Sequence, residues 1–162
     1  PGVGAFANGI NNLKKLGWID AIKQAVLGEK IPILGICLGM QLLADKSFEK
    51  GETEGLRLIP GDIIRLEPKK NKERIPHIGW NEIHFDQQSS IFQDINNDSD
   101  FYFVHSFHFN PKNKKDVLAT TPYCGGFISA VQNENIIGVQ FHPEKSYRAG
   151  FQLIQNFLNL VT

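Results

Sequence analysis

Cys37 stands between two glycines in the stretch ILGICLGMQLL, residues 33–43. The apolar run before it predicts a buried strand of a parallel sheet and the run after it predicts a helix, so Cys37 falls at a strand-to-helix corner. Gly35 and Gly39 allow a tight turn, a positive φ or a close approach of the backbone to a ligand. Free N–H groups at the start of a helix favour a thiolate over a thiol. The pattern fits a nucleophile, and it also fits a buried structural cysteine.

A histidine and a carboxylate follow in IIGVQFHPEKS, residues 136–146. The strand predicted there ends near His142, because Pro143 has no N–H to give to a sheet. In extended backbone His142 and Glu144 project to the same side, so the carboxylate can fix the imidazole tautomer while the other ring nitrogen takes a proton from a thiol. Open α/β sheets place their ligands at the carboxyl ends of strands, and we therefore expect a built site at this position.

Hydrophobic periodicity predicts the elements that position these residues. Apolar residues at three- and four-residue steps between Phe6 and Val26 predict one or two helices, interrupted near Gly17. The stretches DVLATT, ISAVQ and IIGVQF predict strands. Residues 147–161 predict an amphipathic helix, with one apolar stripe formed by Phe151, Ile154, Leu158 and Val161.

The aromatic stretch DFYFVHSFHF, residues 100–109, predicts a single strand with two faces. His105 and His108 then point to opposite sides, so we expect no metal pair there and no cofactor elsewhere. Between residues 52 and 86 the pieces IIRLE and NEIHF predict strands of a hairpin-like region. The run EPKKNKERIP predicts a mobile loop.

Composition limits the class of protein. The 162 residues are 41% hydrophobic and 21% charged, which predicts one globular domain over residues 1–162. Seventeen basic residues balance seventeen acidic ones, which argues against nucleic acid as the main partner. Cys37 and Cys124 form neither a disulfide framework nor a zinc motif, which fits a reducing, cytoplasmic setting. No signal peptide and no run of about 20 apolar residues is present, so we expect no membrane partner.

Two motifs together, GICLGMQLL and GVQFHPEKS, resemble the class I or triad glutamine amidotransferases, whose glutaminase domain carries a Cys–His–Glu triad on a doubly wound α/β fold. Three further stretches, EGLRLIPGDI, IPHIGWNEI and DFYFVHSF, narrow the resemblance to the glutaminase subunits of imidazole glycerol phosphate synthase in histidine biosynthesis. The resemblance runs from Pro1 to about Phe157. Members of the family carry a strand–helix–strand unit of roughly 40 residues before PGVG, so we expect an N-terminally truncated form of this fold.

The resemblance implies a role for each matching residue. Cys37 attacks the carboxamide of glutamine, His142 protonates the departing ammonia and then activates water, and Glu144 orients His142. PGVG matches the oxyanion strand, with the Leu38 amide as the second donor and backbone contacts from Gly2, Val3 and Gly4. The residues that match the binding site for the amino-acid end of glutamine are Gln41, His105, Ser106 and Phe107.

The resemblance also implies a heterodimer with a cyclase subunit of (β/α)8-barrel form. That subunit combines ammonia with a phosphoribulosyl-formimino intermediate, giving imidazole glycerol phosphate and an aminoimidazole carboxamide ribotide. In the family, glutaminase activity is weak until the partner carries its ligand, so we expect little hydrolysis by this chain alone. The residues that match the docking surface are His77, Trp80, Asn81, Lys145 and Ser146.

Other functions remain open from the sequence. An amidotransferase paralogue that supplies ammonia to a surface-sugar synthase shares all three catalytic positions. A non-catalytic assembly subunit would keep the fold and dock a partner, although the presence of all three triad residues argues against a loss of catalytic activity. A cysteine peptidase or a deglycase-like hydrolase on a related sheet does not account for Gln41 or for PHIGWN.

Overall fold

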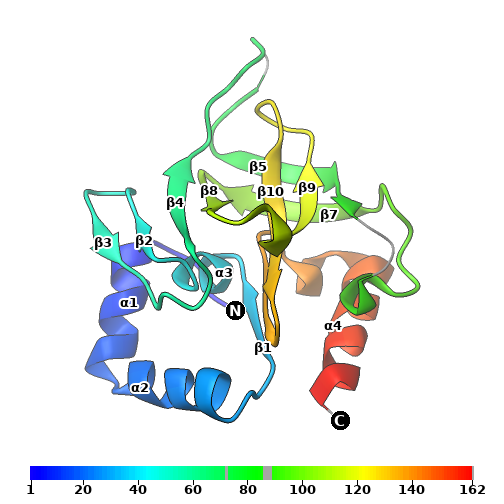
Figure 1. The fold of residues 1–162 in the computed structure, drawn as a ribbon. Helices are drawn as coiled ribbons and strands as arrows, with labels where there is room; N and C mark the ends of the chain where they lie inside the picture. The colour runs from blue at the N-terminus through cyan, green and yellow to red at the C-terminus, as the bar shows by residue number, and fades with distance from the viewer. Residues whose placement is uncertain (72, 86–88, 162) are drawn as a thin grey trace.

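The computed structural model describes residues 1–71, 73–85 and 89–161. Figure 1 shows the chain as a ribbon coloured from its N-terminus to its C-terminus. The helices are α1 (Phe6–Lys15), α2 (Trp18–Lys23), π-helix η1 (Gln24–Gly28), α3 (Leu38–Leu42), 3-10 helices η2 (Ser90–Phe92), η3 (Lys114–Asp116) and η4 (Pro143–Lys145), and α4 (Tyr147–Val161). The strands are β1 (Ile33–Ile36), β2 (Lys46–Ser47), β3 (Thr53–Glu54), β4 (Gly61–Arg65), β5 (His77–Glu82), β6 (His84–Phe85), β7 (Asp100–His105), β8 (Phe107–Pro111), β9 (Val117–Thr121), β10 (Phe127–Asn133) and β11 (Ile136–Val139).

Among the described residues, a nine-stranded mixed sheet organises these elements. Its strands follow the order β1–β11–β10–β8–β4–β2–β3, and β9 pairs β10 and β6 beside this path. In the part of the chain that the structure describes, β1–β11 and β2–β4 are parallel pairs and the other pairs are antiparallel. β5 and β7 form a separate two-stranded antiparallel sheet. The parallel pair β1–β11 is the one that carries Cys37 and His142 at its carboxyl ends.

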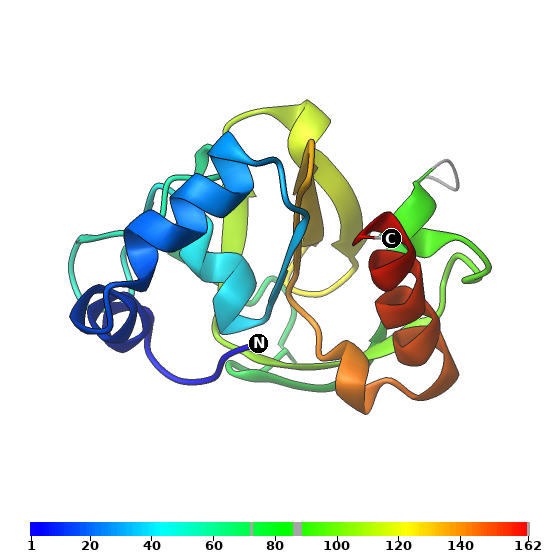
Figure 2. The ribbon, with the colours of Figure 1, turned by 90° about the horizontal axis from the view of Figure 1, so that it is seen from below.

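Helices pack on both faces of the sheet. In Figure 2, α1, α2 and α3 lie on one side of the central strands and α4 lies on the other. Each side has its own core, one containing Phe6 from α1 and the other Leu153 from α4. Because side chains alternate along a strand, Ile136 of β11 enters the first core and Ile137 enters the second. This is the doubly wound arrangement that the sequence predicts.

The aromatic stretch at residues 100–109 forms two strands, so the prediction of a single strand is wrong. β7 ends at His105 and pairs β5, whereas β8 begins at Phe107 and pairs β4 and β10. The chain changes sheets at Ser106, whose carbonyl accepts a hydrogen bond from the Leu66 amide (2.9 Å). Phe103 and Phe109 are both buried, but they enter different cores. Phe103, before Ser106, packs in the core beneath α4, and Phe109, after Ser106, packs in the core beneath α1.

The hairpin-like region predicted between residues 52 and 86 is also wrong, because β4 pairs β8 and β5 pairs β7. NEIHF is divided between β5 and β6, with Ile83 between them. The described residues of EPKKNKERIP form neither a helix nor a strand. Strand partners are chosen by contacts distant in the sequence, and alternation within a short stretch does not specify them.

The predicted helices are confirmed at both ends of the chain. Gly17, at φ 71°, separates α1 from α2 as expected. α4 spans residues 147–161, but its buried residues are Gly150, Leu153 and Asn156, while most of the predicted apolar stripe is exposed. Asn156 donates to the carbonyls of Ile91 (3.0 Å) and Gln93 (2.7 Å), so a polar anchor faces the protein at this position. No helix within the described ranges is long and apolar enough to cross a membrane.

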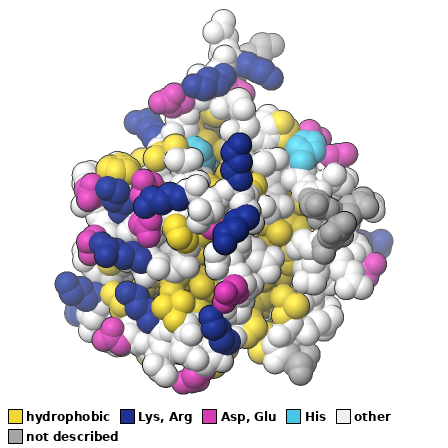
Figure 3. Space-filling view, viewed as in Figure 1, with side chains coloured by type: hydrophobic (Ala, Val, Ile, Leu, Met, Phe, Trp, Pro, Cys, Tyr) yellow, Lys and Arg dark blue, Asp and Glu magenta, His cyan; other side chains and the backbone are white. Residues whose placement is uncertain are grey.

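β1 lies at one end of the strand order. Among the described residues, the edge of β1 that faces away from β11 has one backbone pairing, an isolated bridge between Gly2 and Cys37, the residue that follows β1. Leu27 and Ile31, which lead into β1, are about half exposed. Figure 3, in the view of Figure 1, shows hydrophobic side chains gathered in the lower part of this face. The strand that ends at Cys37 is therefore covered less on this edge than on its β11 edge.

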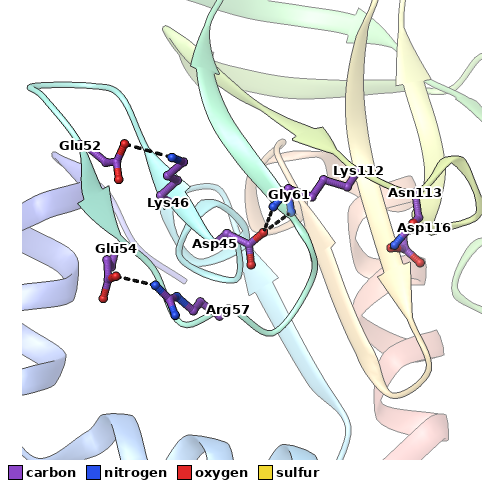
Figure 4. A network of polar contacts seen from close by, with 9 residues as sticks. All are labelled: Asp45, Lys46, Glu52, Glu54, Arg57, Gly61, Lys112, Asn113 and Asp116. Atoms are coloured by element: carbon purple, nitrogen blue, oxygen red, sulfur yellow. Dashed lines mark hydrogen bonds and ion pairs between the residues drawn. The ribbon is translucent and has the colours of Figure 1, made fainter.

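Polar contacts join Asp45, the residue before β2, to the start of β4 and to the residue after β8 (Figure 4). Asp45 accepts hydrogen bonds from the Gly61 amide (3.1 Å) and from Lys112 (2.7 Å). Burial opposes ionisation of Asp45, but the Lys112 and Gly61 hydrogen bonds outweigh it and lower the pKa of the carboxyl group. Arg57 and Glu54 form a second, exposed pair. Exposed pairs of this kind contribute at most about 1 kcal/mol each.

Candidate functional site

Cys37 joins β1 to α3 in a strained backbone conformation. Its φ of 53° and ψ of −108° are values that residues with side chains rarely adopt. Its amide donates to the Val139 carbonyl of the neighbouring strand (2.8 Å), which fixes the corner. A Cβ at Gly35 would lie 2.7 Å from the backbone of Gly39. The cysteine itself therefore takes the positive φ, and Gly35 permits the close approach of strand and helix.

His142 and Glu144 form a hydrogen-bonded pair. His142 Nδ1 lies 2.8 Å from Glu144 Oε1. His142 is extended, with φ −101° and ψ 92°, but Glu144 lies in η4, so the pair meets across a 3-10 turn and the extended geometry expected from the sequence is wrong. A carboxylate accepts hydrogen bonds, so Nδ1 carries the proton and Nε2 is left with a lone pair. Nε2 is buried, with no hydrogen-bond partner among the described residues.

The sheet brings Cys37 and His142 to the same edge. β1 and β11 are parallel neighbours, and Ile36 pairs with Val139 at their carboxyl ends. Cys37 follows Ile36 directly, and His142 comes three residues after Val139. The His142 amide donates to the Tyr102 carbonyl of β7 (2.8 Å), which holds the second segment in place. The segments that carry Cys37 and His142 thus leave the carboxyl ends of adjacent parallel strands, the edge at which α/β sheets place their ligands.

The environment of the Cys37 thiol raises its pKa. Burial is the largest cause, and the negative charge of Glu144 adds to it. The Leu38 amide, the Gln140 side chain and the positive charge of Lys145 act in the opposite direction. The thiol therefore keeps its proton at neutral pH in this state, and a base is needed to remove it. That requirement matches the free lone pair on His142 Nε2.

A cavity of about 320 Å³ opens beside Cys37. Its wall includes residues predicted from the sequence, namely Val3, Gly4, Cys37, Leu38, Gln41, His105, Ser106 and Phe107. Glu49, Pro76 and Val104 also line it. The Glu49 carboxylate accepts a hydrogen bond from the Phe6 amide at the start of α1 (2.7 Å). The cavity therefore has an apolar wall, a thiol and a carboxylate.

The backbone donor predicted for the oxyanion is occupied in this structure. The Leu38 amide donates to the Gly2 carbonyl (3.2 Å), and Gly2 pairs with Cys37 as an isolated bridge. Val3 is exposed, and Gly4 takes a positive φ of 106°. An oxyanion can use the Leu38 N–H only after the Gly2 carbonyl has turned away.

Gln41 uses both of its amide hydrogens inside the protein. Its Nε2 lies 3.1 Å from the Phe107 carbonyl and 3.1 Å from Gln140 Oε1. A ligand in the cavity can therefore find an acceptor, Gln41 Oε1, but no donor on this side chain. The sequence predicts that Gln41 holds the substrate, and in this structure its side chain could do so only by accepting a hydrogen bond.

His105 and His77 bind each other, although the sequence predicts separate roles for them. His105 Nδ1 lies 2.8 Å from the Phe107 carbonyl, which can only accept, so Nδ1 carries the proton. His105 Nε2 is then the acceptor for His77 Nδ1–H (3.0 Å). Burial lowers the pKa of His77 to about 4 and that of His105 to about 3, so both rings are neutral at pH 7. Both ring nitrogens of His105 are engaged, and the ring contributes shape to the cavity wall.

Aromatic side chains cluster on the exposed surface near His142. Trp80 stacks on Tyr147, with ring centroids 4.9 Å apart and planes 6° apart, and Lys145 Nζ lies 5.7 Å from the Tyr102 ring centroid. Ile78 and Tyr147 are 60% and 75% exposed. Large exposed apolar side chains rimmed by polar ones are typical of an interaction surface. Trp80 and Lys145 of the predicted docking set belong to this surface, and Asn81 borders it on β5.

Two members of the predicted docking set lie inside the protein. His77 is 3% exposed and stacks on Tyr123. Ser146 is 1% exposed, and its hydroxyl donates to the His142 carbonyl (2.6 Å) and accepts from the Tyr102 amide (3.0 Å). Their side chains are not available to a partner in this structure. Ser146 instead fixes the backbone of the His142 segment.

Sequence reasoning missed two residues of the site. Glu49 lies in an acidic stretch between β2 and β3, and nothing in its spacing separates it from its acidic neighbours. Gln140 precedes His142 by two residues and is fully buried beside Cys37 (Nε2 to Sγ 3.7 Å). A polar side chain at the end of an otherwise apolar strand was the available signal for Gln140.

Comparisons with known proteins identify the family of this chain. The profile described as class I glutamine amidotransferase matches residues 4–160. Imidazole glycerol phosphate synthase subunit HisH 1 of Campylobacter jejuni is 48% identical over 160 residues, covering 99% of this chain and 79% of that protein. The HisH subunit of Pelagibacter ubique is 44% identical over 161 residues, covering 99% of this chain and 77% of that protein.

Solved structures show the same fold. A crystal structure described as a glutamine amidotransferase superposes with a TM-score of 0.72 at 17% identity, covering 98% of this chain and 75% of that one. A glutamine amidotransferase from Thermotoga maritima gives a TM-score of 0.63 at 22% identity, covering 99% and 60%. These likenesses confirm the α/β fold class expected from the sequence. With the matching profile and relatives, they show that this chain belongs to the class I glutamine amidotransferase family.

Proposed function

We propose that this chain is the glutaminase subunit of an imidazole glycerol phosphate synthase, and that it hydrolyses glutamine to glutamate and ammonia for a cyclase subunit. The observation that carries the proposal is the placement of Cys37 and of the hydrogen-bonded His142–Glu144 pair just beyond the carboxyl ends of neighbouring strands, with Cys37 lining a cavity of about 320 Å³. The names of the relatives from Campylobacter jejuni and Pelagibacter ubique support the assignment to this synthase.

The first half of the reaction forms a thioester. His142 Nε2 takes the thiol proton, and the Cys37 thiolate attacks the side-chain carbonyl carbon of glutamine. Glu144 holds the opposite ring nitrogen and stabilises the imidazolium that results (2.8 Å). The C–N bond then breaks, and His142 gives its proton to the departing nitrogen, which leaves as ammonia. Cys37 is now joined to the glutamyl group.

The second half regenerates the enzyme. His142 Nε2 removes a proton from water, which attacks the thioester carbon. The C–S bond breaks, the sulfur recovers a proton from the imidazolium, and glutamate is released. Ammonia is mostly protonated in neutral water and is then a poor nucleophile, so direct transfer to the cyclase preserves its reactivity.

The occupied Leu38 amide predicts low activity for the chain alone. Both steps build negative charge on the carbonyl oxygen, and a backbone donor aimed at that oxygen contributes about 10²–10³-fold in rate. In this structure the Gly2 carbonyl holds the Leu38 N–H at 3.2 Å. A partner that turns this carbonyl away from Leu38 would therefore raise the rate.

The exposed aromatic surface fits such a partner. Trp80, Tyr147 and Lys145 lie on or next to the segment that carries His142 and Glu144. A cyclase of (β/α)8-barrel form that covers this surface would receive ammonia close to where it is made. We place the heterodimer interface here.

The proposal is tested by measuring glutamate release from the purified chain with and without a cyclase subunit carrying a ligand. We expect turnover to rise at least about 100-fold with the loaded cyclase, the effect of gaining one oxyanion donor. Equal and rapid turnover without the cyclase would contradict the role of the occupied Leu38 amide. Absence of turnover in the complex as well would contradict the glutaminase function itself.

Glu49 is expected to hold the α-ammonium group of glutamine. It brings a negative charge to the cavity wall, and hydrogen bonds to charged groups contribute about 1.5–3 kcal/mol. Glu49→Gln keeps an acceptor for the Phe6 amide but removes the charge, so we expect KM for glutamine to rise about 10- to 100-fold with a much smaller change in kcat. Steady-state kinetics of the complex measure this.

A substrate control separates the charge from the helix contact. Glutaramic acid lacks the α-amino group of glutamine, so wild-type and Glu49→Gln should use it equally poorly. If Glu49→Gln weakened the use of both compounds to the same degree, Glu49 would act through α1 and not through the substrate.

A further inference from the structure

Gln140 occupies a buried position between the two halves of the site. It is the first residue after β11, it is 0% exposed, and its amide donates to the Ser129 carbonyl of β10 (2.8 Å). Its side chain reaches Gln41 on one end and Cys37 on the other. Burying a carboxamide is costly unless its polar atoms are hydrogen-bonded. The contacts at its two ends therefore decide what this side chain does.

The orientation of the Gln140 carboxamide follows from its neighbours. The Phe107 carbonyl can only accept, so the Gln41 atom that lies 3.1 Å from it is the donor Nε2. The second hydrogen of that Nε2 points to Gln140, 3.1 Å away, so the Gln140 atom there is the acceptor Oε1. Gln140 must then turn its own Nε2 to the Cys37 sulfur, at 3.7 Å. The Phe107 carbonyl thus fixes the orientation of the Gln41 carboxamide, and Gln41 in turn fixes that of Gln140.

We propose that Gln140 is a positioning residue for the nucleophile, one whose side-chain amide donates to the Cys37 sulfur and holds the thiolate in the orientation for attack. The inference rests on the proposed function and deepens it. A donor fixed in a buried setting stabilises the charged sulfur more than the neutral thiol. It stays on the sulfur while His142 gives up its proton to the leaving ammonia and takes the next one from water. Gln41 orients Gln140 and lines the cavity, so the same pair of amides contacts the substrate side and the nucleophile.

The test is the pH dependence of Cys37 alkylation by iodoacetamide, measured on the full chain in a Cys124→Ser background. Gln140→Met keeps an unbranched chain of similar size and removes the donor. We expect its alkylation midpoint to rise by about one pH unit, which is a tenfold loss of thiolate at a given pH. Gln140→Glu replaces the donor by a carboxylate and should raise the midpoint at least as far. Glu144 and Lys145, the charged groups that act on the Cys37 thiol, are unchanged in every variant, as is His142.

Two further variants separate positioning from packing. Gln41→Met leaves Gln140 in place but removes the donor that orients it, so we expect a smaller rise in the midpoint. Ser129→Ala alters a buried side chain next to Gln140 and keeps the carbonyl that binds its amide, so we expect the wild-type midpoint. Thermal unfolding of each variant shows that the comparison is between folded proteins.

The proposal is overturned by an unchanged midpoint in folded Gln140→Met, or by an equal rise in Ser129→Ala. If Gln140→Met does not fold, Gln140→Glu and Gln41→Met decide the question by the same readout. Alkylation does not depend on glutamine turnover. A failure of the Gln140 proposal is therefore distinguishable from a failure of the glutaminase function, which the activity of Cys37→Ser reports separately.

Discussion

Cys37→Ser is expected to lower glutaminase activity of the cyclase complex by about 10⁴-fold or more, the scale on which single members of a hydrolase triad act. A hydroxyl is far harder to ionise than a thiol. The proposed base, His142, is therefore strong enough to deprotonate cysteine but much less able to deprotonate serine. Serine is close to cysteine in size, so the strained corner at φ 53° should fold as before. Release of glutamate at saturating glutamine measures the effect.

Cys124→Ser is the matched control for that change. Cys124 also has a positive φ, 54°, and is also buried, but it lies in the turn between β9 and β10 and does not line the cavity. We expect its activity to stay within about twofold of wild type, since surface and turn substitutions away from a site change little. Activity that survives in Cys37→Ser and falls in Cys124→Ser would reverse the assignment of the nucleophile.

Gly35→Ala is expected to destabilise the protein by about 2–3 kcal/mol, or roughly 4–12 °C in melting temperature. The new methyl group would lie 2.7 Å from the backbone carbon and oxygen of Gly39 and 2.8 Å from the Met40 amide. Backbone atoms cannot rotate aside as a side chain can, so β1 and α3 must separate. Calorimetry or thermal circular dichroism measures the loss, and cavity-dependent activity should fall with it.

Gly39→Ala provides the comparison within the same motif. A Cβ there meets nothing closer than the Pro1 nitrogen at 3.9 Å, and alanine favours a helix over glycine by about 1 kcal/mol. We expect equal or higher stability from this variant. If both substitutions cost the same, the close approach at Gly35 would not be the reason for that glycine.

Much of the site was predictable because local physics fixes it. A helix begins after a strained corner, a rule that acts on neighbouring residues, so Cys37 could be placed at the end of β1 from the sequence. The predicted strand before His142 is confirmed, but β11 ends at Val139, three residues before His142. The mutual position of Cys37 and His142 needed one further rule, that ligands lie at the carboxyl ends of parallel strands. The pairing of β1 with β11 agrees with it.

Other parts were not predictable because they depend on contacts distant in the sequence. Residues 100–109 alternate without interruption, yet the chain changes sheets at Ser106, since β5 and β4 offer different partners on its two sides. His105 and His77 are 28 positions apart, and only their pairing across β7 and β5 uses up their ring nitrogens. The prediction that the apolar stripe of α4 is its buried face is wrong. The buried residues are Gly150, Leu153 and Asn156, because the elements packed against a helix decide which of its faces is buried.

The sequence by itself predicted the fold class, which the comparisons confirm, and singled out Cys37, His142 and Glu144 as the proposed triad, because a cysteine at a glycine-lined corner and a His-Pro-Glu segment after an apolar strand are local patterns. The tertiary structure alone decided the rest of the chemistry. It places Glu49 at the cavity wall, pairs the Leu38 amide with the Gly2 carbonyl in a hydrogen bond, and points the Gln140 amide at the Cys37 sulfur. The Leu38–Gly2 contact joins residues 36 positions apart, and the Gln140–Cys37 contact joins residues 103 positions apart. Both form only in the packed sheet, where hydrogen-bond direction is set by atoms that no local pattern specifies.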